Sequence, residues 1–84
     1  MSINTEFATN LGRECAAQIN GSTDADNWSP LDDGSDIPDG DHCAMRDHYK
    51  YCELTYVEIR DIERAYCAGF NSVFVPINNS WKRN

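Results

Sequence analysis

Residues 55–70, TYVEIRDIERAYCAGF, decide the fold, because they combine a helix start signal with an apolar stripe at helical spacing. Thr55 followed three residues later by Glu58 is typical of a capping box, in which each side chain accepts a hydrogen bond from the other residue's backbone N–H. The stripe consists of Ile59, Ile62, Tyr66 and Phe70. This pattern predicts a helix over residues 56–68, with Gly69 as its C-terminal cap.

Two more helices are predicted upstream of this stretch. The first covers residues 4–19, is capped by Asn4 or Thr5, and carries an apolar residue at every fourth position: Phe7, Leu11, Cys15 and Ile19. Gly12 inside it costs about 1 kcal/mol relative to alanine, so its presence indicates close packing against a neighbour. The second covers residues 41–53, with one face formed by Ala44, Met45, His48, Tyr49 and Cys52. The capping box favours a break before the third helix over one fused helix.

The C-terminal segment 71–77, NSVFVPI, is rich in β-branched and aromatic residues and is predicted to be extended. Pro76 restricts it to the edge of a sheet, because proline has no N–H to donate. Its pairing partner would be either the same segment of a second subunit or a piece of loop 21–40. The predicted fold is therefore mainly α, a small three-helix domain that spans residues 1–84.

Loop 21–40 is strongly acidic and cannot form a core of its own. It holds three glycines and two prolines without apolar periodicity, and seven aspartates lie between positions 24 and 41. No lysine or arginine occurs between Glu14 and Met45. Trp28, Leu31 and Ile37 interrupt the acids, and we expect these three side chains to pin the loop onto the helices. The loop is then a surface element whose carboxylates point outward.

The net charge of −7 limits the classes of partner. Chains this acidic are repelled by phosphate backbones and anionic membranes, so direct nucleic-acid or membrane binding is not expected. A partner selected by electrostatics carries positive charge. The sequence contains neither an apolar run long enough to span a bilayer nor a recognisable secretory signal, which predicts a cytoplasmic location.

Four cysteines, Cys15, Cys43, Cys52 and Cys67, are expected to be free thiols in a reducing compartment. His48 and Cys52 would lie on one face of a helix, as metal ligands often do, so a small zinc-binding regulator that also uses other cysteines is an alternative function. The chain has no C-x-x-C pair, and the Asp-rich loop does not fit the spacing of an EF-hand. The leading prediction therefore includes no metal and no cofactor.

Catalysis and DNA reading are both poorly supported. His42 lies within the acidic run and His48 on a helix face, and neither has an evident nucleophile beside it, so no catalytic residue is assigned and the protein is predicted not to be an enzyme. The last two predicted helices, with a short break between them, resemble a helix-turn-helix, which would suggest DNA binding. However, the candidate recognition helix pairs Arg60 and Arg64 with Glu58, Asp61 and Glu63 and so lacks the excess positive charge that drives DNA affinity.

A row of carboxylates can imitate the phosphates that a basic cleft binds. In size, charge and lack of catalytic motif, the chain resembles phage-encoded inhibitors of bacterial defence, the anti-CRISPR and anti-restriction proteins. The resemblance implies a protein of the host cytoplasm that blocks the nucleic-acid-binding surface of a positively charged protein or nucleoprotein complex, such as a CRISPR effector. The chain itself is expected to be a monomer or a homodimer. A further alternative is a homodimeric scaffold joined through residues 71–77. The predicted partner-binding residues are Asp24, Asp26, Trp28, Leu31, Asp32, Asp33, Asp36, Asp39 and Asp41.

Overall fold

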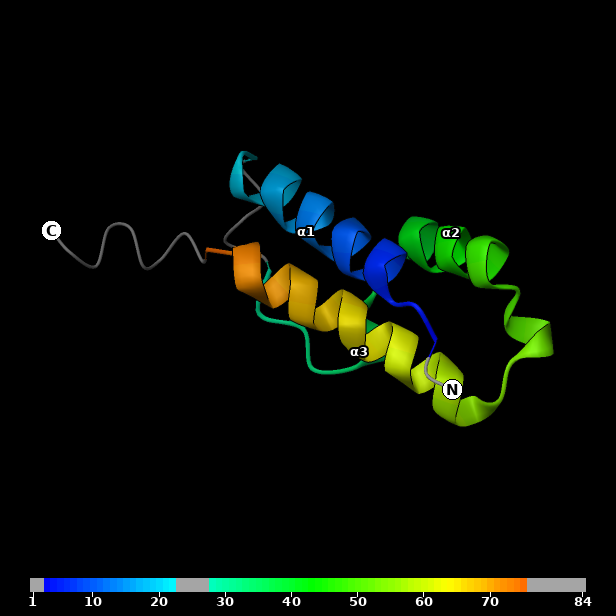
Figure 1. The fold of residues 1–84 in the computed structure, drawn as a ribbon. Helices are drawn as coiled ribbons and strands as arrows, with labels where there is room; N and C mark the ends of the chain where they lie inside the picture. Colours follow the sequence, from blue (N-terminus) through cyan, green and yellow to red (C-terminus); the bar gives the residue numbers. More distant parts are fainter. Residues whose placement is uncertain (1–2, 23–27, 76–84) are drawn as a thin grey trace, which may run out of the picture.

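The computed structural model describes residues 3–22 and 28–75, which form three α-helices and two short 3-10 helices (Figure 1). In chain order these are α1 (Glu6–Asn20), η2 (Gly34–Asp36), α2 (Asp39–Tyr49), η3 (Tyr51–Glu53) and α3 (Tyr56–Val73). Helices α1 and α3 lie side by side and run in the same direction, whereas α2 runs the opposite way along the N-terminal part of α1 (Figure 1). The predicted mainly α, three-helix architecture is confirmed.

Small residues let the backbones of α1 and α3 approach closely. Ala8 and Ala16 on α1 are fully buried, and Gly12 lies between them. A Cβ atom built on Gly12 would stand 2.2 Å from the carbonyl oxygen of Tyr66. On α3, a Cβ atom at Gly69 would stand 2.3 Å from the carbonyl oxygen of Thr9. The close packing expected at Gly12 is confirmed, and the helix pair depends on a glycine from each side.

The second predicted helix ends earlier than expected. Lys50 adopts a left-handed conformation with φ of 55°, which stops α2 at Tyr49, and residues 51–53 form η3 instead of a fourth turn. The expected break before α3 is confirmed. Thr55 Oγ1 accepts from the Glu58 N–H at 3.2 Å, and Glu58 Oε1 accepts from the Thr55 N–H at 2.9 Å, so the predicted capping box is present.

The prediction that Gly69 ends the third helix is wrong. Gly69 is buried against α1, and α3 continues to Val73. The predicted extended segment 71–77 is therefore wrong for its first three residues. The rings of Phe70 and Phe74 stack with centroids 5.2 Å apart, which holds the last turn of the helix in the core. Phe74 has an extended backbone conformation, and Pro76 and Ile77 lie outside the described residues.

The core lies along α3. Its largest fully buried side chains are Tyr66, Phe70, Met45 and Ile62. Three of the four residues of the predicted α3 stripe are therefore fully buried in the core, and the fourth, Ile59, is half-buried. The ends of α1 and α3 are joined by Asn20, whose Nδ2 donates to the Val73 carbonyl at 2.9 Å. Within residues 3–22 and 28–75, no helix combines the length and the apolar character required to cross a bilayer.

Candidate functional site

The described part of the acidic loop before α2, residues 28–38, is fixed to the helices by apolar and amide contacts. Leu31 and Ile37 are buried, and the Trp28 ring lies 5.8 Å from the Phe70 ring. The side chain of Asn71 on α3 clamps the backbone of Leu31 from both sides. Asn71 Oδ1 accepts from the Leu31 N–H at 2.8 Å, and Asn71 Nδ2 donates to the Leu31 carbonyl at 2.9 Å. The expectation that apolar side chains pin the loop is confirmed.

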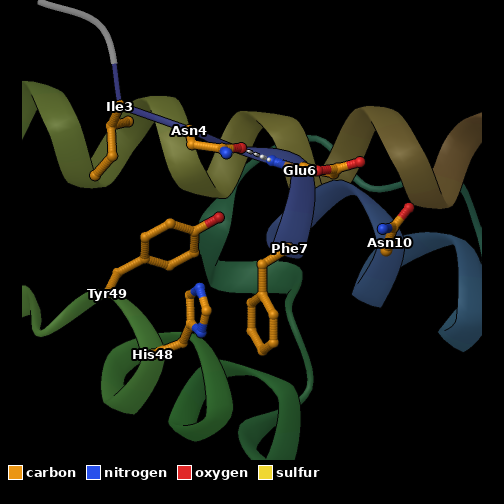
Figure 2. Close-up of a pocket in the computed structure, with 7 residues that line it drawn as sticks. All are labelled: Ile3, Asn4, Glu6, Phe7, Asn10, His48 and Tyr49. Atoms are coloured by element: carbon orange, nitrogen blue, oxygen red, sulfur yellow. Dashed lines mark hydrogen bonds between the residues drawn. The ribbon is translucent and has the colours of Figure 1, made fainter.

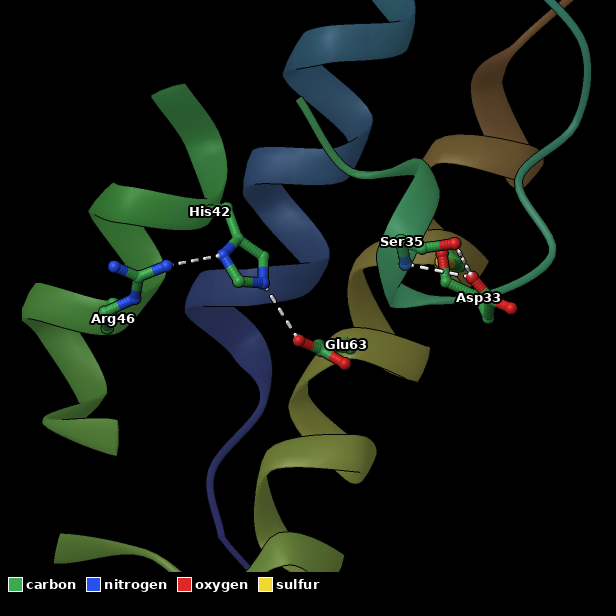
Figure 3. A network of polar contacts seen from close by, with 6 residues as sticks. Asp33, Ser35, His42, Arg46 and Glu63 are labelled. Atoms are coloured by element: carbon green, nitrogen blue, oxygen red, sulfur yellow. Dashed lines mark hydrogen bonds and ion pairs between the residues drawn. The ribbon is translucent and has the colours of Figure 1, made fainter. Parts of the chain in front are cut away.

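Of the predicted site residues, Asp39 is exposed at the first position of α2, and Asp32, Asp33 and Asp36 are exposed on this loop. Two of them also shape it, because Asp33 Oδ1 accepts from the backbone N–H of Ser35 at 2.9 Å and Asp36 Oδ2 accepts from the Asp32 N–H at 2.9 Å. Figure 3 shows Asp33 turned back onto Ser35 at the start of η2. The hydrogen bonds from the Ser35 hydroxyl and backbone lower the pKa of Asp33. The carboxylates of Asp33 and Asp36 are thus held in place by local hydrogen bonds.

Of the other five predicted site residues, the three that the structure describes do not share that surface. Leu31 belongs to the core, and Trp28 is half-buried on Phe70. Asp41 is half-buried and accepts a short hydrogen bond from the fully buried Tyr66 hydroxyl, so its carboxylate joins α2 to α3. Asp24 and Asp26 lie outside the described residues.

Sequence reasoning missed a polar network that links α2 to α3. His42 Nε2 lies 3.0 Å from Glu63 Oε2, and the Arg46 guanidinium lies 3.1 Å from His42 Nδ1 (Figure 3). Because a guanidinium can only donate, Nδ1 accepts, and the ring proton sits on Nε2 and is donated to Glu63. The Glu63 carboxylate also fills the space beside Gly34, where a Cβ atom would stand 2.1 Å from Oε1. The acidic loop therefore lies directly against the Glu63 side chain of α3, and a larger residue at position 34 would require that carboxylate to move.

A hollow of about 540 Å³ lies between the start of α1 and the end of α2 (Figure 2). Phe7 and His48 stack across it with ring centroids 3.8 Å apart and nearly parallel planes. The Tyr49 hydroxyl accepts from the Ala8 N–H at 3.2 Å, which satisfies one of the free donors in the first turn of α1. The aromatic side chains of α2 thus dock the helix onto α1.

The described structure does not assemble the alternative zinc site. His48 and Cys52 were expected on one helix face, but α2 ends between them at Tyr49, and both side chains are exposed. Across residues 3–22 and 28–75, no three His, Cys, Asp or Glu side chains converge as metal ligands would. All four cysteines are free thiols, of which Cys67 is buried, Cys15 half-buried, and Cys43 and Cys52 exposed.

Cys67 gives a testable pH dependence. Burial raises the pKa of its thiol from 9.0 to about 11, with a further contribution from the nearby carboxylates of Asp36 and Asp33. The stabilising effect of the neutral thiol is complete below pH 9.0 and is lost as the pH rises toward about 11. We expect the melting temperature to fall over this interval and to fall less steeply in Cys67→Ala. Thermal melts followed by circular dichroism test this; equal slopes for both proteins would contradict it.

The comparisons with known proteins give no relative. No family model matches the chain, and no curated protein or solved structure matches it significantly.

Proposed function

We propose that the protein binds a positively charged surface of another protein through the acidic surface, defined here as Asp32, Asp33, Asp36 and Asp39. The observation that carries the proposal is that all four carboxylates are exposed on fixed backbone. Three lie on a loop held by Leu31, Ile37 and the Asn71 clamp, and the fourth begins α2. A fixed array loses less conformational entropy on binding than a flexible acidic tail. Within the described residues, none of the four forms an ion pair.

The class of partner that fits this surface is a nucleic-acid-binding enzyme. Its basic cleft is complementary to a row of carboxylates in the same way as to phosphates, which favours fast, steered association. The resemblance in size and charge to anti-CRISPR and anti-restriction proteins makes bacterial defence complexes, including CRISPR effectors, the first partners to test. On this proposal the protein acts in the host cytoplasm by excluding DNA or RNA from the cleft.

The test removes the four charges while keeping the loop. One variant combines Asp32→Asn, Asp33→Asn, Asp36→Asn and Asp39→Asn. Asparagine is chosen because its amide oxygen can still accept the hydrogen bonds that shape η2. The matched control removes four exposed acidic charges elsewhere: Glu14→Gln, Asp47→Asn, Glu53→Gln and Asp61→Asn. Each protein is used to capture partners from bacterial lysate, and the affinity for the captured partner is then measured across salt and against competing DNA.

We expect the loop variant to bind about 100-fold more weakly, which corresponds to about 0.7 kcal/mol for each lost charge contact. The control should bind nearly as well as the wild type, and DNA should displace the wild-type protein. Equal losses in both variants would mean that net charge alone matters. Binding that is unaffected by the loop substitutions, by salt or by DNA would overturn the proposal.

A further inference from the structure

The N-terminal half of α3 carries an exposed strip of aromatic, apolar and cationic side chains. Tyr56 and Val57 are 73% and 65% exposed, more than any other large apolar side chain in the described residues. Arg60 lies over the Tyr56 ring, 5.8 Å from its centroid, and Arg64 follows one turn later. Neither arginine forms an ion pair within the described part of the chain. This α3 strip, Tyr56, Val57, Arg60 and Arg64, is therefore exposed and makes no ion pair with the described residues.

Opposite charges face the strip across a hollow of about 500 Å³. One wall includes Tyr56, Arg60 and Arg64 together with the half-buried Glu63, and the other includes Asp32 and Asp33 of the acidic loop. The Glu63 carboxylate accepts from His42 Nε2. Both aspartates are exposed, yet neither comes within ion-pair distance of the arginines. A purely anionic ligand would meet the aspartates, and a purely cationic one would meet the arginines. An occupant that fits must itself carry separated positive and negative groups.

This chain presents such a surface. In a two-fold symmetric dimer, each contact of one residue with another occurs twice with the roles exchanged, so the interface must be complementary to itself. An axis through the hollow places the arginines of each copy against the aspartates of the other. Two acidic chains repel each other through their net charge. Burial of the exposed Tyr56 and Val57 side chains at the interface supplies apolar area that offsets this repulsion.

We propose that a second copy of this chain docks on the hollow between the α3 strip and Asp32–Asp33, forming a two-fold symmetric homodimer. This interface differs from the pairing through residues 71–77 that the sequence offers as an alternative. The proposal does not depend on the proposed function. Asp32 and Asp33 take part in both, however, so the dimer withholds these two carboxylates from any other partner.

Charge exchange tests the interface with the full-length chain. Arg60→Glu/Arg64→Glu makes both walls acidic, and Asp32→Lys/Asp33→Asn makes both walls basic or neutral, while the amide at position 33 keeps the cap of η2. A control, Arg13→Glu/Lys50→Glu, makes the same change in net charge as Arg60→Glu/Arg64→Glu, on exposed residues outside the hollow. Circular dichroism establishes that each variant is folded. Sedimentation equilibrium at physiological ionic strength then gives the dimer dissociation constant.

We expect the wild type and the control to dimerise, and each hollow variant alone to dimerise at least about 10-fold more weakly. An equimolar mixture of the two hollow variants should recover a dimer, because the charges again alternate across the interface. A wild type that stays monomeric at the highest concentration, or a mixture that stays monomeric although both variants are folded, would overturn the proposal.

Discussion

Gly12→Ala should destabilise the protein by at least about 3 kcal/mol, the upper end of the cost of overpacking a core. The added methyl group would stand 2.2 Å from the Tyr66 carbonyl oxygen and 2.9 Å from the Phe70 nitrogen. Both atoms belong to the backbone of α3, so no side-chain rotation relieves the contact, and the helix pair must separate. Against a total stability of about 4–13 kcal/mol for 84 residues, this is a large fraction. Gly69→Ala should have a similar effect.

Gly40→Ala is the matched control for this prediction. Gly40 lies in the first turn of α2, and a Cβ atom there would have no heavy atom within 4 Å. The same substitution should therefore raise the stability by about 0.5–1 kcal/mol through helix propensity and the unfolded chain. Urea denaturation of the three variants measures these differences. A Gly12→Ala protein as stable as Gly40→Ala would mean that α1 and α3 do not touch at this point.

Asp41→Ala should cost about 2–3 kcal/mol in stability, although the residue belongs to the acidic run and was expected to face a partner. Its carboxylate is the acceptor of the Tyr66 hydroxyl, and Tyr66 is fully buried. Removal of the acceptor leaves that hydroxyl without a partner in the core, which costs more than the loss of an exposed hydrogen bond. Tyr66→Phe removes the hydroxyl donor itself and so leaves no unpaired hydroxyl in the core; it should cost about 1–2 kcal/mol. In the Tyr66→Phe background, Asp41→Ala should then cost much less.

Tyr51→Phe provides the opposite case for the same chemical change. The Tyr51 hydroxyl is buried without a hydrogen-bond partner among the described residues, and burial raises its pKa to about 12. Its removal should leave the stability unchanged or raise it by up to about 1 kcal/mol. Chemical denaturation of the four proteins and the Asp41–Tyr66 double variant gives the coupling energy. Additive effects of Asp41→Ala and Tyr66→Phe would show that the two side chains do not act as a pair.

The helices could be predicted because caps and apolar stripes involve residues that are close together in the sequence. The Thr55–Glu58 box and the stripe on α3 identified the third helix and the break before it. The same reasoning failed at Gly69, since a glycine that ends a helix and a glycine that admits a neighbouring backbone look alike in a sequence. The predicted end of the second helix at residue 53 was wrong for a related reason, because nothing in the sequence indicates that Lys50 adopts a left-handed conformation.

The site was predictable only in part, because charge is a property of composition and placement is not. The acids of the loop were evident, yet Asp41 and Asp33 differ completely in their surroundings, one bonded to a core tyrosine and the other exposed. Leu31 was expected both to pin the loop and to contact a partner, and the structure places it in the core. Asn71, which clamps the loop from 40 positions away, had no sequence signal at all.

The common direction of α1 and α3 gives the molecule an electrical polarity. Two helix N-termini, each with the equivalent of about half a positive charge, lie at one end, and two C-termini lie at the other. Asp32 and Asp33 line the same hollow as Tyr56, Arg60 and Arg64, so part of the acidic surface lies beside the first half of α3. The positive end of the α3 dipole therefore attracts these carboxylates. The separation of charge between the two ends of the molecule is then smaller than the two parallel helices alone would give.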